Sequence, residues 1–201
     1  MCGRYQLLRP EDIAARFETV NTIPDLIASN DVRPTQPIPV IDMERRLVLM
    51  RWGFVPSWAK EVGTGSPLIN ARAEGIEQKP TFRKPLRYQR CIIPASGFYE
   101  WQATSSGKKI KHLFTGADGD LMALAGLYDT WKTPQGSDLT SCVIITTTPN
   151  ELVAPVHNRM PVILAPEDED VWLNPDETES EALLPFLRPL PAADLRDQVV
   201  A

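Results

Sequence analysis

The chain reads Arg90-Cys91-Ile92-Ile93-Pro94-Ala95-Ser96-Gly97-Phe98-Tyr99-Glu100-Trp101 near its centre, and this stretch decides the fold class. Residues 91–94 and 98–101 predict two strands, because short runs of branched aliphatic and aromatic residues fit the half-buried surface of a sheet. The small residues 95–97 between them predict a turn. The centre of the chain is therefore expected to be β structure.

Further short elements are predicted on both sides of this stretch. A helix is expected after Pro10, with Ile13, Phe17 and Val20 on one face. Many short strands with few helices are typical of an α+β fold. We therefore expect a single domain with a β-rich, barrel-like core of short strands and peripheral helices. The other predicted strands are 38–41, 46–52, 110–115, 121–128, 139–147 and 161–164, and the other predicted helices are 166–173 and 178–184.

One domain is expected over residues 1–201, because no repeat or linker divides the chain. The motifs that carry chemistry fall within 2–165, whereas 166–201 reads as an acidic, proline-rich and helical C-terminal part. The net charge is −5, but eight acidic residues lie between 166 and 181, and without them basic residues outnumber acidic ones. A basic stretch over 79–90 therefore leaves nucleic-acid binding open, with solvated surface charge as the alternative.

The composition excludes several classes of protein. With 43% hydrophobic and 23% charged residues, the chain is neither disordered nor a coiled coil throughout. No apolar run is long enough to span a membrane, and the first residues lack the apolar region of a signal peptide, so we expect a cytoplasmic protein. Three cysteines without paired spacing and only two histidines argue against a disulfide framework and a zinc site. No metal or cofactor is expected.

Cys2 is the residue with the most specific chemical implication. A residue as small as cysteine at position 2 favours removal of Met1, which leaves Cys2 with its α-amine and its thiol on adjacent carbons. The ordinary pKa values of these groups are about 8 and about 8.5, so both are reactive near neutral pH. The amine can condense with an aldehyde to an imine, and the thiolate can then close a five-membered thiazolidine ring. The alternative is an incidental cysteine at a disordered terminus.

Three internal segments combine polar side chains with apolar neighbours. Asn70 and Arg72 alternate onto one face of a predicted strand, where they suit a reactive group and a phosphate. Glu100 stands among three aromatic residues, and burial there would raise its pKa into the range of a general acid or base. His157 can shuttle protons, whereas His112 lies in a lysine-rich hairpin and is expected at the surface. The alternative for the first two segments is that Asn70, Arg72 and Glu100 are exposed residues at the edge of a strand.

Taken together, five segments resemble the SRAP (SOS response-associated peptidase) family, whose members shield abasic sites in single-stranded DNA. Each segment alone is weak, but all five follow the family order across residues 1 to about 165. They are Met1-Cys2-Gly3-Arg4-Tyr5, Trp52-Gly53-Phe54-Val55-Pro56-Ser57-Trp58, Ile69-Asn70-Ala71-Arg72-Ala73-Glu74, Arg90 to Trp101 as quoted above, and His157-Asn158-Arg159-Met160-Pro161.

The resemblance implies a set of roles. Cys2 would form a stable thiazolidine cross-link with the aldehyde of an opened abasic deoxyribose, and Asn70 would position the N-terminus and the sugar. Glu100 would move protons during ring opening and imine chemistry, and His157 would assist the imine steps and cross-link reversal. The DNA contacts that the resemblance implies are phosphate-binding arginines, base-stacking tryptophans and two pocket residues: Arg4, Arg72, Arg159, Trp58, Trp101, Thr146 and Pro34.

The resemblance also implies an enzyme with lyase-like, single-turnover chemistry. The family name records a peptidase activity, which the same residues would direct at Met1. The implied partner is single-stranded DNA with an abasic site, and a further partner in the replication machinery stays open. We expect a monomer without membrane contact, associated with the nucleoid in a bacterium. Asp31 stands where family members usually carry asparagine, which removes any amide role at that position.

Two rival functions remain open at this stage. Glutamine amidotransferases with an N-terminal nucleophile also begin Met-Cys-Gly, but Arg4 and Tyr5 replace the aliphatic residue that usually follows, and the other motifs have no place in that scheme. A plain single-stranded DNA-binding module needs only the arginines and tryptophans. A glutaminase assay and the substitution Cys2→Ala separate these functions from covalent capture.

Overall fold

A closed five-stranded barrel forms the centre of the protein in the computed structural model, which describes residues 2–63 and 65–200. Its strands are β3 (Pro37–Ile41), β4 (Leu47–Trp52), β6 (Arg90–Ala95), β9 (Met122–Lys132) and β10 (Asp138–Thr147). Strand β10 pairs in parallel with β4, and antiparallel pairs run from β4 through β3, β6 and β9 back to β10. The predicted barrel-like α+β core is confirmed.

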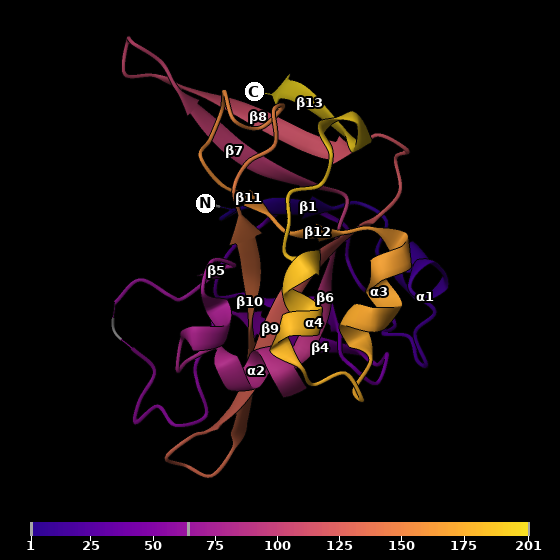
Figure 1. The fold of residues 1–201 in the computed structure, drawn as a ribbon, viewed down its shortest axis with the longest axis vertical. Coiled ribbons are helices and arrows are strands. Elements are labelled where there is room, and N and C mark those ends of the chain that lie inside the picture. The colour runs from indigo at the N-terminus through magenta and orange to yellow at the C-terminus, as the bar shows by residue number, and fades with distance from the viewer. Residues whose placement is uncertain (1, 64, 201) are drawn as a thin grey trace.

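A second sheet stands against one end of this barrel (Figure 1). Its strands, in spatial order, are β13 (Leu195–Val200), β8 (Lys109–Gly116), β7 (Gly97–Ala103), β1 (Tyr5–Leu7) and β2 (Ser29–Val32). Only Ser96 separates β6 from β7, so the chain passes there from the barrel into the second sheet. Gly97 suits this crossing, because a Cβ atom would lie 2.9 Å from the Phe114 carbonyl oxygen. The two strands predicted at 91–101 exist, but they belong to different sheets.

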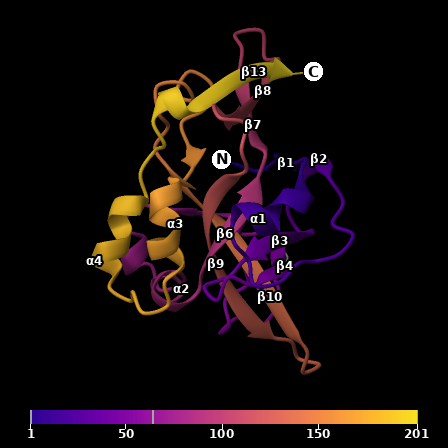
Figure 2. The same cartoon turned by 90° about the vertical axis from the view of Figure 1, so that its right-hand side faces the viewer.

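Shorter elements cover the barrel. Figure 2 shows α2, α3 and α4 together on one side of it, and α1 contacts α3 through Arg16 and Glu169. Three short strands pair with barrel strands: β5 and β11 pair with β10, and β12 pairs with β9. The elements are α1 (Ile13–Arg16), β5 (Asn70–Arg72), α2 (Arg83–Tyr88), β11 (Met160–Pro161), β12 (Ile163–Leu164), α3 (Pro166–Leu173) and α4 (Ser180–Leu183), with single 3-10 turns at Pro10–Asp12, Ile76–Gln78, Leu184–Phe186 and Ala192–Asp194.

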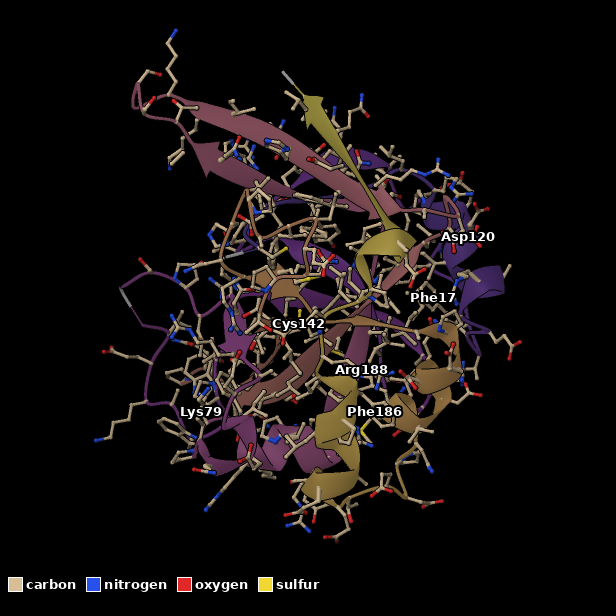
Figure 3. All side chains as sticks on the ribbon, turned by 45° about the horizontal axis from the view of Figure 1, so that its top comes forward. Phe17, Lys79, Asp120, Cys142, Phe186 and Arg188 are labelled. Carbon is tan, nitrogen blue, oxygen red and sulfur yellow. The ribbon has the colours of Figure 1, made fainter. Side chains whose placement is uncertain are left out.

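The core fills the barrel and continues between the two sheets. Trp52 and Phe17 are almost completely buried, and the Phe98 and Phe114 rings of the second sheet stack with centroids 5.0 Å apart. Cys142 lies in the middle of the molecule (Figure 3). Burial raises the pKa values of both Cys142 and Cys91, so these thiols stay protonated and serve as core residues.

Three predictions of local structure were incomplete. The helix after Pro10 is shorter than its pattern suggested, and Val20 lies outside it with 70% of its surface exposed. The C-terminal part is not only helical, because it ends in β13, which pairs with β8 over its whole length. Its acidic block includes a buried carboxylate, Glu169, which accepts hydrogen bonds of 3.0 and 2.7 Å from Arg16. Within the described ranges, no helix is long and apolar enough to cross a membrane.

Candidate active site

The end of β10 gathers two of the predicted site segments. Strand β5 runs parallel to β10 and places Asn70 beside Ile144. Strand β11 lies on the adjoining part of β10, where Thr147 faces Met160, and this pairing holds the preceding turn with His157. Polar residues 70 and 157, which are far apart in sequence, therefore meet at one end of the barrel.

The second sheet contributes the other two residues. Strand β1 pairs with β7, and the Tyr99 backbone N–H donates to the Arg4 carbonyl oxygen at 2.9 Å. This pairing brings Cys2, three residues before the start of β1 at Tyr5, close to Glu100 on β7. Cys2 is completely buried and its carbonyl oxygen accepts a hydrogen bond of 2.9 Å from the Asn70 side-chain amide. Neighbouring strands therefore fix the position of the second residue of the chain.

Glu100 links Cys2 to the histidine. The residue is 2% exposed, and its Oε2 lies 3.8 Å from Nε2 of His157. Nδ1 of the same ring lies 3.0 Å from the backbone nitrogen and 3.1 Å from the carbonyl oxygen of Arg159, so the Arg159 backbone holds the ring with Nε2 on the side of Glu100.

Burial controls the acidity of the three ionisable groups. It raises the pKa of Glu100 to about 7, because a carboxylate loses its hydration there. It also raises the pKa of the Cys2 thiol, and the nearby Glu100 charge adds to that rise. The pKa of His157 is lowered, first by burial and further by the charge of Arg159. Near neutral pH the thiol is protonated, the imidazole is largely neutral and Glu100 exchanges its proton readily.

Asn70 carries an unused hydrogen-bond acceptor. Its Nδ2 donates to Cys2, but its Oδ1 is buried and has no partner among the described residues. Buried polar atoms in native proteins nearly always have a partner, so an orphaned oxygen beside a nucleophile indicates that a ligand or an amine completes the contact. This feature supports the predicted positioning role of Asn70.

The predicted phosphate-binding arginines lie in different environments. Arg72 is exposed on β5, and its guanidinium makes no hydrogen bond or ion pair with any other described residue. Arg159 forms an ion pair with Glu74, lowers the pKa of that carboxyl, and donates to the carbonyl oxygen of the buried Thr146. Arg159 is therefore held by the protein, whereas Arg72 is available to a ligand.

Arg4 and Trp101 lie together on the outer face of the second sheet. The Arg4 guanidinium packs 5.8 Å from the centroid of the Trp101 ring and forms an ion pair with Asp31. Arg33 also contacts Asp31, and the two guanidiniums, Arg33 foremost, lower the pKa of this carboxyl. The residue that departs from the family pattern thus orders two arginines instead of supplying an amide.

Two predicted DNA-binding residues lie apart from this centre. Trp58 is 68% exposed in the loop between β4 and β5. Pro34 is half-buried in the turn between β2 and β3. Among the described residues, neither forms a hydrogen bond with Cys2, Asn70 or Glu100.

The expectation that His112 lies at the surface was wrong. Its side chain is buried on β8 directly across from Glu100, and its Nδ1 lies 2.9 Å from Asp197 on β13. The lysine-rich hairpin suggested exposure, but β13 covers this edge of the sheet. The alternation of Lys109, Lys111 and His112 along one strand was the available signal, because neighbouring residues of a strand face opposite sides.

Comparison with known proteins assigns the chain to a family. The family model described as SOS response associated peptidase (SRAP) matches residues 1–201. The chain belongs to the SRAP family. This SRAP protein is 44% identical over 201 residues to "Abasic site processing protein YoqW" of Bacillus subtilis (strain 168), an alignment that covers 97% of this chain and 90% of the relative.

More distant SRAP relatives and solved structures agree with this assignment. "Abasic site processing protein HMCES" of Gallus gallus is 32% identical over 169 residues, covering 73% of this chain and 50% of its own. A crystal structure of a protein from Bacteroides thetaiotaomicron superimposes with a TM-score of 0.90 at 27% identity, covering 100% of this chain and 92% of that one. The barrel with its second sheet is therefore a fold that this chain shares with a solved structure.

The donor set of the site suits proton transfer and nucleophilic attack. In the residues that the structure describes, no group of three or more His, Cys, Asp or Glu side chains could hold a metal ion. The arrangement instead combines a nucleophile, a carboxyl with a pKa of about 7, a neutral imidazole and an amide. Groups of these kinds can take part in acid–base and covalent chemistry.

Proposed function

We propose that this SRAP protein processes abasic sites in single-stranded DNA by forming a covalent thiazolidine cross-link through Cys2 after removal of Met1. The placement of Cys2 carries the proposal. Its backbone is held by Asn70, and its thiol lies beside a Glu100 carboxyl with a pKa of about 7. Relatives named as abasic site processing proteins support the choice of target.

The reaction conserves atoms with the loss of one water. The α-amine nitrogen of Cys2 attacks C1′ of the opened sugar and forms a carbinolamine. Protonation of its hydroxyl by the Glu100 carboxylic acid lets water leave, and a C=N bond forms. The Cys2 thiol then gives its proton back to the Glu100 carboxylate, sulfur bonds to C1′, and the π electrons of the C=N bond pass to the nitrogen, which keeps its own proton. A thiazolidine results.

Glu100 must first give a proton and then accept one. A group does both well only when its pKa lies near the working pH, and burial places the pKa of Glu100 at about 7. The protonated thiol of Cys2 needs a base before it attacks, and the Glu100 carboxylate is the nearby acceptor. His157, with Nε2 at 3.8 Å from Glu100, supplies a second proton carrier for the imine steps and for reversal.

The strand of DNA is proposed to bind along the exposed cations around this site. Arg72 follows Asn70 by two residues on β5, so a phosphate on its guanidinium places the neighbouring sugar near Cys2. Arg4 and Arg159 contribute further charge, and the Trp101 ring offers a stacking surface. The remaining proposed contacts are Trp58, Pro34 and Thr146.

The peptidase activity in the family name is proposed to act on the chain itself. Release of Met1 breaks the peptide bond before Cys2 and frees the α-amine that the cross-link needs. The Asn70 amide proposed to serve the cross-link also holds the residue that follows this bond, since it donates to the Cys2 carbonyl oxygen. We propose lyase-like, single-turnover chemistry by a monomer where single-stranded DNA is exposed, such as the bacterial nucleoid, with the replication machinery as a further partner.

A denaturing gel tests the proposal. Wild-type protein is incubated with a single-stranded oligonucleotide that carries one abasic site, and a band that survives denaturation is expected. Cys2→Ala should abolish this band, whereas Cys142→Ala, which removes an equally buried thiol inside the barrel, should retain it. An equally strong band from Cys2→Ala would overturn the proposal. Native binding without a covalent band would indicate a binding module, and Cys2-dependent hydrolysis of glutamine an amidotransferase.

A further inference from the structure

Both histidines of the chain lie next to Glu100. His157 approaches its carboxyl from the turn before β11, with Nε2 at 3.8 Å from Oε2. His112 is the direct cross-strand neighbour of Glu100 in the antiparallel pair of β7 and β8. Directly opposed residues point to the same face of a sheet, with Cβ atoms about 5 Å apart. Glu100 therefore has an imidazole on each of two sides.

Asp197 determines which nitrogen of His112 carries a proton. Both of its carboxylate oxygens lie 2.9 Å from Nδ1. A carboxylate only accepts, so Nδ1 must donate, and in the neutral ring Nε2 is left with a lone pair. The ring also lies nearly parallel to the Phe114 ring, with an interplanar angle of 16° and centroids 6.2 Å apart.

The remaining nitrogen is a buried acceptor. Nε2 of His112 has no hydrogen-bond partner among the described residues, and the side chain is only 9% exposed. Among the described residues, the ionisable groups that face Glu100 from the elements packed around it include His112 of β8, His157 and the Cys2 thiol. Asp197 of β13 faces His112 from the other side. Lys111 is on the opposite face of β8, above the Tyr99 ring.

We propose that His112, oriented by Asp197, is a positioning residue that accepts the hydrogen bond of the protonated Glu100 carboxyl. The hydrogen bond itself does not depend on the proposed function, whereas its role in catalysis rests on that function. The contact holds the acid form of Glu100 in one orientation while it waits to protonate the carbinolamine hydroxyl. When Glu100 ionises, the lone pair of Nε2 and the carboxylate repel each other, and the carboxylate turns toward His157 and Cys2.

The C-terminal strand is thereby coupled to the reaction. Strand β13 lies on the outer edge of the second sheet, beside β8 (Figure 1), and Asp197 is the residue through which it contacts His112. The last strand of the chain, which carries none of the proposed DNA contacts, thus sets the tautomer of a residue next to the general acid. Positioning through two side chains also explains why a buried imidazole occupies a site otherwise lined by Phe98 and Phe114.

Nuclear magnetic resonance tests the contact without requiring any cross-link. The 15N signals of His112 and the 13C carboxyl signal of Glu100 are followed against pH in the full chain, with His112→Phe and Glu100→Gln used for assignment. We expect Nε2 of His112 to be unprotonated and its frequency to change with the midpoint of Glu100, near pH 7. A His112 frequency that does not change as Glu100 ionises would overturn the proposal.

Two substitutions separate a hydrogen bond from simple filling of space. His112→Phe removes the acceptor and should shift the Glu100 midpoint to lower pH by about half a unit to one unit, because the acid form loses its partner. His112→Gln keeps an acceptor oxygen and should shift it by less. Equal shifts in both variants, or no shift in a folded His112→Phe, would make His112 structural. Asp194→Asn, an exposed acid before β13, is the matched control for Asp197→Asn and should leave the midpoint unchanged.

The cross-linking rate then connects the contact to function. Its dependence on pH should move in parallel with the Glu100 carboxyl signal in the same variants, while affinity for an undamaged strand stays constant. A shifted carboxyl signal in a protein that forms no cross-link would retain the positioning pair and reject the proposed function. A cross-link whose pH dependence is the same in wild type and His112→Phe would retain the function and reject the pair.

Discussion

The His112–Asp197 pair and the His157–Glu100 pair differ in how tightly a carboxylate holds an imidazole. In the first pair, both carboxylate oxygens lie 2.9 Å from Nδ1. In the second, the closest oxygen is 3.8 Å from Nε2, and burial raises the pKa of Glu100 to about 7. A close pair fixes a proton on one nitrogen of the imidazole. In the loose pair, where the carboxyl has a pKa near neutrality, the proton stays exchangeable.

The difference shows how one sheet supplies both rigidity and reactivity. Strands β7 and β8 carry Glu100 and His112 side by side, yet only Glu100 lies beside the Cys2 nucleophile. The tight pair is placed at the edge strand β13, away from Cys2. Changes to the loose pair should therefore alter the rate of chemistry, and changes to the tight pair should alter orientation and stability.

The largest effect is expected from Glu100→Gln. The amide keeps the shape of the side chain but can neither give nor accept the proton, so cross-linking should slow by about 100-fold or more. Rates are measured with saturating abasic oligonucleotide, and binding of the undamaged strand is measured alongside. A large loss of binding with an unchanged rate at saturation would mean that Glu100 is structural.

His157→Ala should have a smaller effect on the same reaction. The imidazole supports Glu100 from 3.8 Å instead of reacting directly, so we expect about a 10-fold slower cross-link and a stronger slowing of its reversal. Reversal is followed by transfer of the pre-formed adduct to excess competitor. If His157→Ala and Asp197→Asn slowed the cross-link equally, the contrast between the two pairs would fail.

Arg72→Ala should weaken binding while leaving both imidazole pairs intact. Loss of one phosphate contact is expected to reduce affinity several-fold and to lower the slope of log affinity against log salt by about 1. Lys132→Ala is the matched control, because Lys132 is an exposed cation on the far β9–β10 hairpin, paired with Asp138. An unchanged salt slope for Arg72→Ala would remove Arg72 from the phosphate contacts.

The smallest effect is one of stability against pH. The folded state raises the pKa of Glu100 from 4.5 to about 7, so folding favours its protonated form. The stability that this protonated form contributes is complete below pH 4.5 and is lost as the pH rises through 7. Glu100→Gln should therefore have a Tm a few degrees above wild type at pH 8, with the gap closing at pH 5. A gap that is the same at both pH values would contradict burial as the cause.

Much of the barrel follows from local sequence pattern. The strands around Ile92, Leu124 and Ile144 were expected because their branched residues are buried on both sides, and the bounds of the helix from Pro166 to Leu173 agree with its prediction. Strand β13 was missed because its exposed charged residues carry no apolar alternation; it exists only through pairing with β8. Sequence pattern predicts which side chains of a segment become buried, but it does not predict which strand the segment pairs with.

The same limit applies to the site. Resemblance to the SRAP family pointed to Cys2, Asn70, Glu100 and His157, and the structure brings these four together. His112 was missed because its partner Asp197 follows 85 residues later on a strand that was not predicted. A buried polar pair across such a separation has no signature in either segment alone.

The most direct test of the account is intact-protein mass spectrometry before and after incubation with the abasic oligonucleotide. The account predicts that the protein lacks Met1, and that the adduct weighs the sum of protein and DNA minus one water, with the bond mapped to Cys2. Retained Met1 with a full yield of adduct, or an adduct mapped to a lysine, would contradict the aminothiol mechanism.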